Sequence, residues 1–287
     1  MADCVSLSFI LGRRLEKLKN ILDWYINASI HVACATAALV GITNYYSELE
    51  FDLGILLFVF CSTMSSYNII KYAGYVVRHH HFKKTLKAIL GFTVLGLLVC
   101  GYYFFTFQFS TQVAIAVFGL LNVLYVIPLG EGKSNLRNLA GIKIYIVSIC
   151  WAGVTLLLPL LEAGESITQD IVLKFIQRFI LTLILILIFE INDLKYDDER
   201  LKTLPQTIGV SNTKRLIYVL SGIFFVLDFL KEGTYPHQTV VNSILVAVMV
   251  LLTYFVHKNR SKYYTLFWAE SVPILWYALI ILFIFLG

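Results

Sequence analysis

The sequence has little charge for its length. Asp, Glu, Lys and Arg make up 14% of its 287 residues, whereas 59% are hydrophobic. A soluble domain carries about a quarter charged residues, so this chain lacks the polar surface that a soluble protein of its size needs. The surplus apolar surface must face lipid, which predicts a single polytopic membrane domain over residues 1–287. We expect membrane lipids, and not nucleic acid, around it.

Paired cysteines and a secretory signal are also missing. The five cysteines have no paired spacing, and four of them lie within apolar stretches, so we expect free buried thiols and no cysteine metal site. The short apolar stretch at residues 5–11 precedes its basic residues, which is the wrong order for a cleavable signal peptide. Residues 1–20 are better interpreted as a cytoplasmic or interfacial segment that leads into the first span.

Long apolar runs dominate the rest of the chain. Most are close to the roughly 20 residues that a helix needs to cross a bilayer, and they lack the alternation of barrel strands. The predicted fold class is therefore an all-α membrane protein, a bundle of nine transmembrane helices within residues 21–287. The nine predicted spans are Ile21–Ile42, Leu53–Val77, Leu86–Phe107, Val113–Leu129, Ile142–Leu161, Ile171–Ile191, Leu216–Leu230, Val240–Val256 and Leu266–Leu286.

The basic residues predict the orientation of these spans. Eighteen of the 23 Lys and Arg residues fall in the N-terminal segment or in every second connecting loop, and the other loops contain only Lys231 together with acidic residues. Positive charge concentrates on the cytoplasmic side of membrane proteins. We therefore expect a cytoplasmic N-terminus, a C-terminus on the far side, and a multi-pass protein of the bacterial inner membrane.

The sixth apolar stretch ends in a group of carboxylates. At about 100° per residue, Glu190, Asp193 and Asp197 fall within roughly 60° of one another on a helix. Acidic groups at a membrane face are costly unless a cation is held there. The spacing predicts a shared Mg²⁺ that bridges to a diphosphate, with Lys202 as a further charge partner. The alternative is a solvated loop whose opposite charges pair with each other.

Other polar residues are predicted at the same membrane face. Asn68, Lys71 and Tyr72 share one face of the second span near its cytoplasmic end. Lys71 either snorkels to the interface or lines the interior of the bundle. Arg137 and Lys143 lie near the start of the fifth span. Together with the carboxylates, these residues predict a polar cavity that opens to the cytoplasm.

The segment from Asn192 to Gly209 resembles a motif of the UbiA superfamily of intramembrane prenyltransferases. That motif is DxxxD, then a basic residue, K-T-L-P and G; Asp193 and Asp197 match its aspartates, although Lys202 follows about one residue sooner than usual. The sequence Tyr125–Pro128 is similar to the Y-x-x-P ending of the family's fourth helix. The nine predicted spans, with an acidic loop after the sixth, also resemble the family's topology.

The chain departs from the family at the first aspartate motif. That motif reads NDxxDxxxD at the end of the second helix, where Asn68 matches the Asn but the aspartate positions fall on Ile69, Tyr72 and Val76. The resemblance implies Mg²⁺ bound between two acidic walls, and only the second wall is present here. One hypothesis is that Lys71 or Arg78 neutralises the diphosphate directly.

The resemblance implies Mg²⁺-dependent transfer of an isoprenyl group from a prenyl diphosphate to a small, lipophilic or aromatic acceptor. The expected metal ligands are Asp193, Asp197 and Glu190, and Lys71 is expected to act with the two aspartates in catalysis. The expected substrate-binding residues are Asn68, Tyr72, Arg78, Arg137, Lys143 and Lys202. The alternative is a non-catalytic isoprenoid- or lipid-binding membrane protein that has lost the transferase chemistry.

Overall fold

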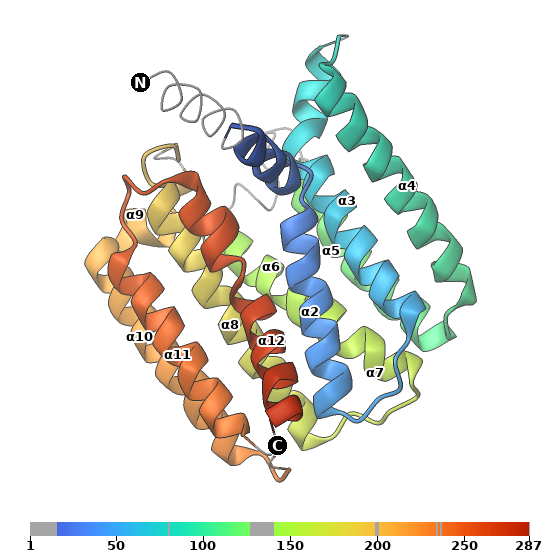
Figure 1. Ribbon diagram of the computed structural model, residues 1–287, viewed down its shortest axis with the longest axis vertical. Helices are drawn as coiled ribbons and strands as arrows, with labels where there is room; N and C mark the ends of the chain where they lie inside the picture. The colour runs from blue at the N-terminus through green and yellow to red at the C-terminus, as the bar shows by residue number, and fades with distance from the viewer. Residues whose placement is uncertain are drawn as a thin grey trace, which may run out of the picture.

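The described part of the chain is a bundle of helices (Figure 1). The computed structural model describes residues 16–79, 81–126, 141–198, 201–233, 235 and 237–286. The first described helix is Glu16–Asn27. It is followed by α2 (Ile30–Tyr46), α3 (Leu53–Arg78), α4 (Lys84–Thr106), α5 (Phe109–Val126), α6 (Ile142–Ala152), the π-helical η2 (Gly153–Leu157), α7 (Leu158–Glu162), α8 (Gln169–Asp193), α9 (Leu204–Ile208), α10 (Val210–Val226), the 3₁₀ turn η4 (Leu227–Leu230), α11 (Gln238–Phe255), the π-helical η5 (Tyr264–Ala269) and α12 (Val272–Leu286).

Within the described ranges, six helices are long and apolar enough to cross a membrane. A seventh is added when Glu16–Asn27 and α2 are counted as one broken span. These helices are those of an integral membrane protein, as the composition predicted. Two further predicted spans fall on α5 and α10, which are shorter. The last residues of the predicted span Val113–Leu129 lie outside the described residues.

The first predicted span, Ile21–Ile42, is not one straight helix. The helix Glu16–Asn27 and α2 meet at an angle of 61°. Between them, Ser29 has a left-handed backbone with a φ of 58°, a conformation that side-chain-bearing residues rarely adopt. A helix that breaks leaves main-chain carbonyls without their usual partners, so other parts of the bundle must supply donors here.

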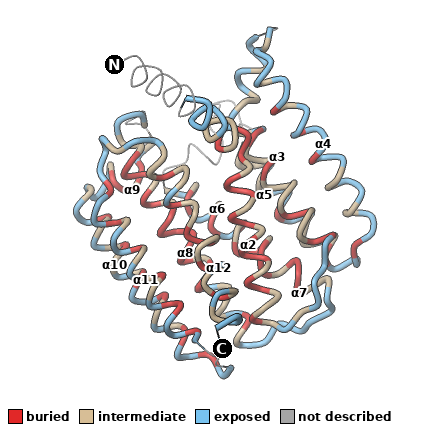
Figure 2. Tube along the Cα trace, viewed as in Figure 1, coloured by how far each residue is buried: buried red, intermediate tan, exposed pale blue. Residues whose placement is uncertain are grey.

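Helix α8 is the central helix of the bundle. Its apolar residues are buried on most sides, and it packs on α6, α10 and η5. Figure 2 shows the contrast with α4, which is exposed along most of its length. A helix that is apolar all round belongs in a core or against lipid. Helix α8 is the case in the core, and α4 is the case against lipid.

Two charged groups are buried at or against the N-terminal half of α8: Arg178 of α8 itself and Lys231, which follows η4. Arg178 is 4% exposed and donates from Nη1 to the Thr43 hydroxyl (2.6 Å) and to the Thr155 carbonyl (2.9 Å). Lys231 donates to Asp228 (2.8 Å) and to the amide oxygen of Gln177 on α8 (2.7 Å). Burial lowers the pKa of Lys231 despite this ion pair.

Helices α3 and α4 approach each other closely at a glycine. A Cβ on Gly96 would lie 2.7 Å from the hydroxyl oxygen of Ser65 and 3.4 Å from the carbonyl of Cys61. Ser65 also donates to the Thr93 carbonyl at 3.2 Å. Small residues let membrane helices pack backbone to backbone, which fixes α3 in position as one wall of the site described next.

Candidate functional site

Glu190 at the acidic end of α8 joins three elements. It is 4% exposed, and its carboxylate forms an ion pair with Lys143 at 3.0 Å. Its second oxygen accepts the main-chain N–H of Leu204 at 3.2 Å. Lys143 is in the first turn of α6 and Leu204 begins α9. Glu190 therefore holds the start of α6 and the start of α9 against the end of α8.

Asp193 and Asp197 lie one turn apart beyond Glu190. The N–H of Asp197 donates to the carbonyl of Asp193 at 3.1 Å, so the helical path continues past the last residue of α8. Both side chains are half-buried, and the Asp193 carboxylate interacts electrostatically with Asp197 and Lys143. The structure thus brings together Lys143, Glu190, Asp193 and Asp197, as the spacing predicted.

The donor set suits a Mg²⁺ ion held by two carboxylates better than by three. In the described residues, no group of three or more His, Cys, Asp or Glu side chains is placed to hold a metal. Glu190 is occupied by Lys143 and Leu204. Mg²⁺ commonly takes one or two protein carboxylates and keeps water and phosphate oxygens, which Asp193 and Asp197 can supply. The role predicted for Glu190 as a ligand stays a prediction, and it requires the ion pair with Lys143 to open.

Three residues in the C-terminal half of α3 hold the break in the first span. Each donates to one of three consecutive main-chain carbonyls. The bonds run from Asn68 Nδ2 to Ala28 O (3.1 Å), from Lys71 Nζ to Ile26 O (3.2 Å) and from Tyr72 Oη to Asn27 O (2.9 Å). Lys71 also donates to the Ser29 hydroxyl at 3.2 Å. We call these three α3 residues the break clamp.

The break clamp changes the interpretation of Lys71. The sequence left two positions open for its ammonium group, at the interface or in the lining of the bundle. In the structure Lys71 is exposed and its ammonium group donates to the carbonyl of Ile26, and the two alternatives stay predictions. The carboxylate of Glu270, half-buried at the end of η5, interacts with it electrostatically. The predicted contact of Lys71, Asn68 and Tyr72 with a diphosphate stays a prediction, since their described bonds are made within the protein.

The other predicted substrate-binding residues lie farther apart. Arg78 is exposed at the end of α3. Lys202 is exposed just before α9, with a φ of 44°. Arg137 lies outside the described residues, as do Lys133 and Pro128. Of the predicted cations, the structure therefore places Lys143 beside the carboxylates of α8.

The helix Glu16–Asn27 is fastened at this same end of the bundle. Its Asp23 accepts hydrogen bonds from Lys262 Nζ (2.6 Å) and from Tyr263 Oη (2.8 Å), which lie between α11 and η5. The bond to the Asp23 carboxylate raises the pKa of Lys262. Together with the break clamp, this contact connects α3 and the start of η5 through one short helix.

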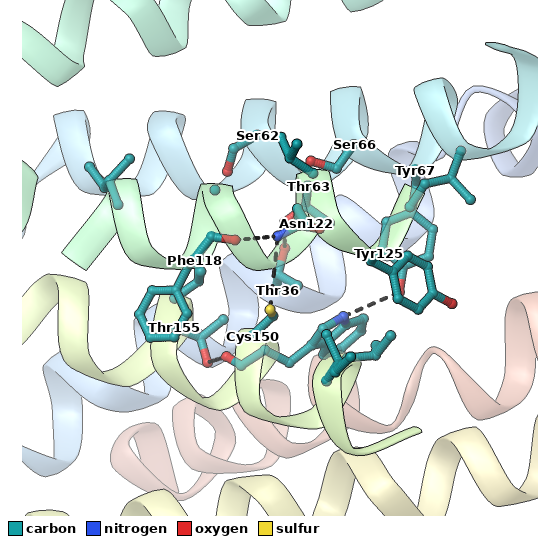
Figure 3. Close-up of a pocket in the computed structure, with 18 of the residues that line it drawn as sticks. Thr36, Ser62, Thr63, Ser66, Tyr67, Phe118, Asn122, Tyr125, Cys150 and Thr155 are labelled. Atoms are coloured by element: carbon teal, nitrogen blue, oxygen red, sulfur yellow. Dashed lines mark hydrogen bonds between the residues drawn. The ribbon is translucent and has the colours of Figure 1, made fainter. Parts of the chain in front are cut away.

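A cavity of about 530 Å³ lies between α2, α3, α5, α6 and η2. Its volume is within the range of small-molecule sites. Figure 3 shows Tyr67 and Tyr125 at one end and Phe118 with Thr155 at the other. One wall carries the hydroxyl groups of Thr36, Ser62, Thr63, Ser66 and Tyr67. The facing wall is largely apolar, with Ile115, Phe118, Val123, Ile146, Val147, Val154 and Leu158.

The cavity adjoins the charged end of α8. Ile146 and Val147, which line it, follow Lys143 by one helical turn on α6. The indole N–H of Trp151 donates to the Tyr67 hydroxyl at 3.2 Å across the cavity. Sequence reasoning missed this chamber. The signal was the run of Ser and Thr residues within the apolar stretch of α3, because polar residues in a span face a partner or a cavity.

Comparisons with known proteins were made by sequence and by structure. No protein-family model matches the sequence, and no curated protein matches it. Solved structures do match. The apo structure of a UbiA homologue from Aeropyrum pernix K1 has a TM-score of 0.65 at 13% identity, over 89% of this chain and 98% of that one. The chain has the UbiA fold. The fold that the sequence resemblance implied is thereby confirmed.

Two further structures with the UbiA fold carry information on ligands. A UbiA homologue from Archaeoglobus fulgidus bound to DMAPP and Mg²⁺ matches with a TM-score of 0.62 at 12% identity, over 89% of this chain and 96% of that one. A digeranylgeranylglyceryl phosphate synthase matches with a TM-score of 0.56 at 15% identity, over 93% and 98% of the two chains. The UbiA fold therefore extends over nearly the whole of each chain.

Proposed function

We propose that this chain is a UbiA-type prenyltransferase, which transfers an isoprenyl group from a prenyl diphosphate to a small, lipophilic or aromatic acceptor. The observation that carries the proposal is the acidic end of α8 beside a large, partly apolar cavity in this fold. A UbiA homologue with the same fold is bound to DMAPP and Mg²⁺, which supports the choice of substrate class.

In this proposal, Asp193 and Asp197 hold Mg²⁺ through their adjacent carboxylates. The bound cation would offset the negative charge of the diphosphate as it leaves. Lys143 interacts electrostatically with Asp193 and adds positive charge, and Lys202 is close in sequence. The aromatic rings of Tyr67 and Trp151 line the cavity, where aromatic faces can stabilise an allylic cation.

The same proposal includes the topology. Nine spans with a cytoplasmic N-terminus place Asp193, Asp197 and Lys143 at the cytoplasmic face, where a water-soluble diphosphate can reach them. The positive-inside distribution of Lys and Arg supports this orientation. The isoprenoid tail then extends into the membrane-embedded cavity of a single domain, in a bacterial inner membrane.

The test is pyrophosphate release by the purified full chain in lipid nanodiscs with Mg²⁺, labelled prenyl diphosphates and lipid extract as a source of acceptor. Asp193→Asn and Asp197→Asn should each reduce release by at least a hundredfold. Asp170→Asn, at the opposite end of α8, is the matched control and should retain activity. Equal rates in all four proteins would refute the assignment of Asp193 and Asp197.

A second candidate is a non-catalytic isoprenoid-binding membrane protein. The break clamp favours it, because Asn68 and Tyr72, at the Asn position and at one aspartate position of the family's first motif, bond to main-chain carbonyls of this chain. In that case, the purified protein should bind prenyl diphosphates without turning them over, with or without acceptor. Mg²⁺-dependent turnover that requires Asp193 would exclude this second candidate.

A further inference from the structure

Phe118 of α5 reaches across the cavity wall to the backbone of the next span. It is 8% exposed and lines the cavity. A Cβ built on Gly153 would lie 1.9 Å from the end of the Phe118 ring, far inside any real contact. The ring therefore rests directly on the Cα of Gly153, and only a glycine at this position leaves room for it.

The backbone under the ring is held in place from behind. Gly153 begins the π-helical segment η2, where the helix of the fifth predicted span is locally widened. The carbonyl of Thr155 in this segment accepts bonds from the Thr43 hydroxyl (2.7 Å) and from Arg178 Nη1 (2.9 Å). The surface that supports the ring is therefore anchored to α2 and to α8, and it is not free to retreat when the ring is pushed.

The Phe118 side chain is also packed among apolar side chains. Phe118 belongs to a buried cluster with Val40, Ile55, Phe58, Val59, Phe107, Cys150 and Leu158. Three of these, Phe58, Cys150 and Leu158, also line the cavity. Phe118 thus forms the boundary between the empty volume and a dense apolar region. A smaller side chain would extend the cavity into apolar surroundings, and a displaced ring has free space only on the cavity side.

We propose that Phe118, seated on Gly153, sets the length of the isoprenoid chain that the cavity accepts. The inference rests on the proposed function for its ligand class, an isoprenoid whose polar end is at the Lys143 end of the cavity. It assigns a specificity-determining role to a pair of residues that contact the hydrocarbon tail and not the reacting atoms.

The two residues allow changes in opposite directions. Phe118→Ala enlarges the deep part of the cavity and should favour longer chains. Gly153→Ala pushes the ring into the cavity and should favour shorter ones. Each additional methylene that is buried improves affinity by about fourfold, so one extra isoprene unit should change the ratio of affinities by at least about tenfold. Val123→Ala, on the same helix nearer the Tyr125 end, should weaken all chain lengths alike and is the matched control.

The experiment measures binding of labelled geraniol, farnesol and geranylgeraniol to the full chain in nanodiscs, without Mg²⁺ or turnover. The expected result is a preference shifted to longer alcohols in Phe118→Ala, shifted to shorter ones in Gly153→Ala and unchanged in Val123→Ala. If Gly153→Ala does not fold, Phe118→Leu should give a smaller shift than Phe118→Ala in the same direction.

Two outcomes would overturn the inference. One is the same order and ratio of affinities in wild type, Phe118→Ala and Phe118→Leu. The other is no binding of any of the three alcohols to the wild type, because the cavity then does not hold an isoprenoid. Length-dependent binding that shifts as expected, in a protein that releases no pyrophosphate, supports the inference and refutes only the proposed transferase activity.

Discussion

The break clamp predicts that Lys71 stabilises the fold before it does anything to a substrate. Replacing Lys71 by Met keeps the length of the side chain and removes the ammonium group. The carbonyl of Ile26 and the hydroxyl of Ser29 then lose their donor. A hydrogen bond from a charged group contributes about 1.5–3 kcal/mol. Lys71 is exposed, so solvent screens part of this, and we expect the free energy of unfolding to fall by about 1 kcal/mol.

Replacements of the other two members of the break clamp give losses of stability with which Lys71→Met can be compared. Tyr72→Phe removes one bond between a neutral donor and the carbonyl of Asn27, for which about 0.5–1.5 kcal/mol is expected. Asn68 is 1% exposed and donates to two acceptors, Ala28 O and Thr93 Oγ1. Asn68→Leu should therefore cost more than Tyr72→Phe. The three effects should not add, because all three bonds support the same bend.

The assay is equilibrium unfolding in mixed detergent micelles, followed by circular dichroism and by tryptophan fluorescence. Trp24 lies in the helix that the clamp holds, with its ring centroid 5.7 Å from that of Phe92, so its emission should change at lower denaturant in Lys71→Met than in the wild type. Lys87→Met, an exposed lysine on α4 at the same membrane face, is the control and should leave both signals unchanged.

The result that would refute the reasoning is unchanged stability in Lys71→Met. If the unfolding free energy stays within about 0.5 kcal/mol of wild type while turnover of a prenyl diphosphate is lost, Lys71 acts on the substrate as the sequence hypothesis held. Loss of stability with turnover retained at low temperature would support the structural role.

Three more predictions concern stability. Asp228→Asn leaves the ammonium group of Lys231 buried without its carboxylate, so thermal unfolding should show a loss of about 3–5 kcal/mol, much of which the double replacement Asp228→Leu with Lys231→Met should restore. Gly96→Ala makes the Ser65 hydroxyl and the end of Met64 give way, which disturbs the bond from Ser65 to the Thr93 carbonyl. It should cost about 1 kcal/mol in the same measurement, whereas no change would contradict the close approach. The hydrogen bond to Asp23 raises the pKa of Lys262 in the folded state. The stabilisation from Lys262 is therefore complete below its unfolded pKa of about 10.4 and is lost as pH rises through the raised folded pKa. Above the folded pKa, wild type and Lys262→Met should have the same unfolding free energy, and a difference between them that grew with pH would refute the sign.

The sequence predicted the helices well because a helix that crosses lipid needs a run of roughly 20 apolar residues, which is visible in the sequence. Over the residues that the structure describes, every apolar stretch proposed from the sequence falls mainly on helical segments, although the first and the last are each divided between two of them. The break at Ser29 was missed, since the apolar pattern runs through it without a Gly or Pro. What fixes the bend is a set of bonds from Asn68, Lys71 and Tyr72, which are about 40 residues away in the chain and cannot be read from local pattern.

The candidate site was predicted in part. Helical spacing was enough to place Asp193 and Asp197 together, because both lie on one helix and its extension. The ion pair between Glu190 and Lys143 depends on how α6 packs against α8, which spacing does not determine. The seat of Phe118 on Gly153 depends on the local widening of η2, and the sequence gives no signal for a π-helical turn.

The buried guanidinium of Arg178 has a consequence for how the chain enters the membrane. A charged residue at the centre of a span costs about 2.5–3.5 kcal/mol during insertion. Both residues that accept its bonds, Thr43 and Thr155, precede it in the chain. Because the chain is made from its N-terminus, the segments that carry both acceptors are synthesised before α8. Membrane insertion of the second half of the bundle then depends on the first half. In the reverse order of synthesis, Arg178 would enter the membrane before its acceptors.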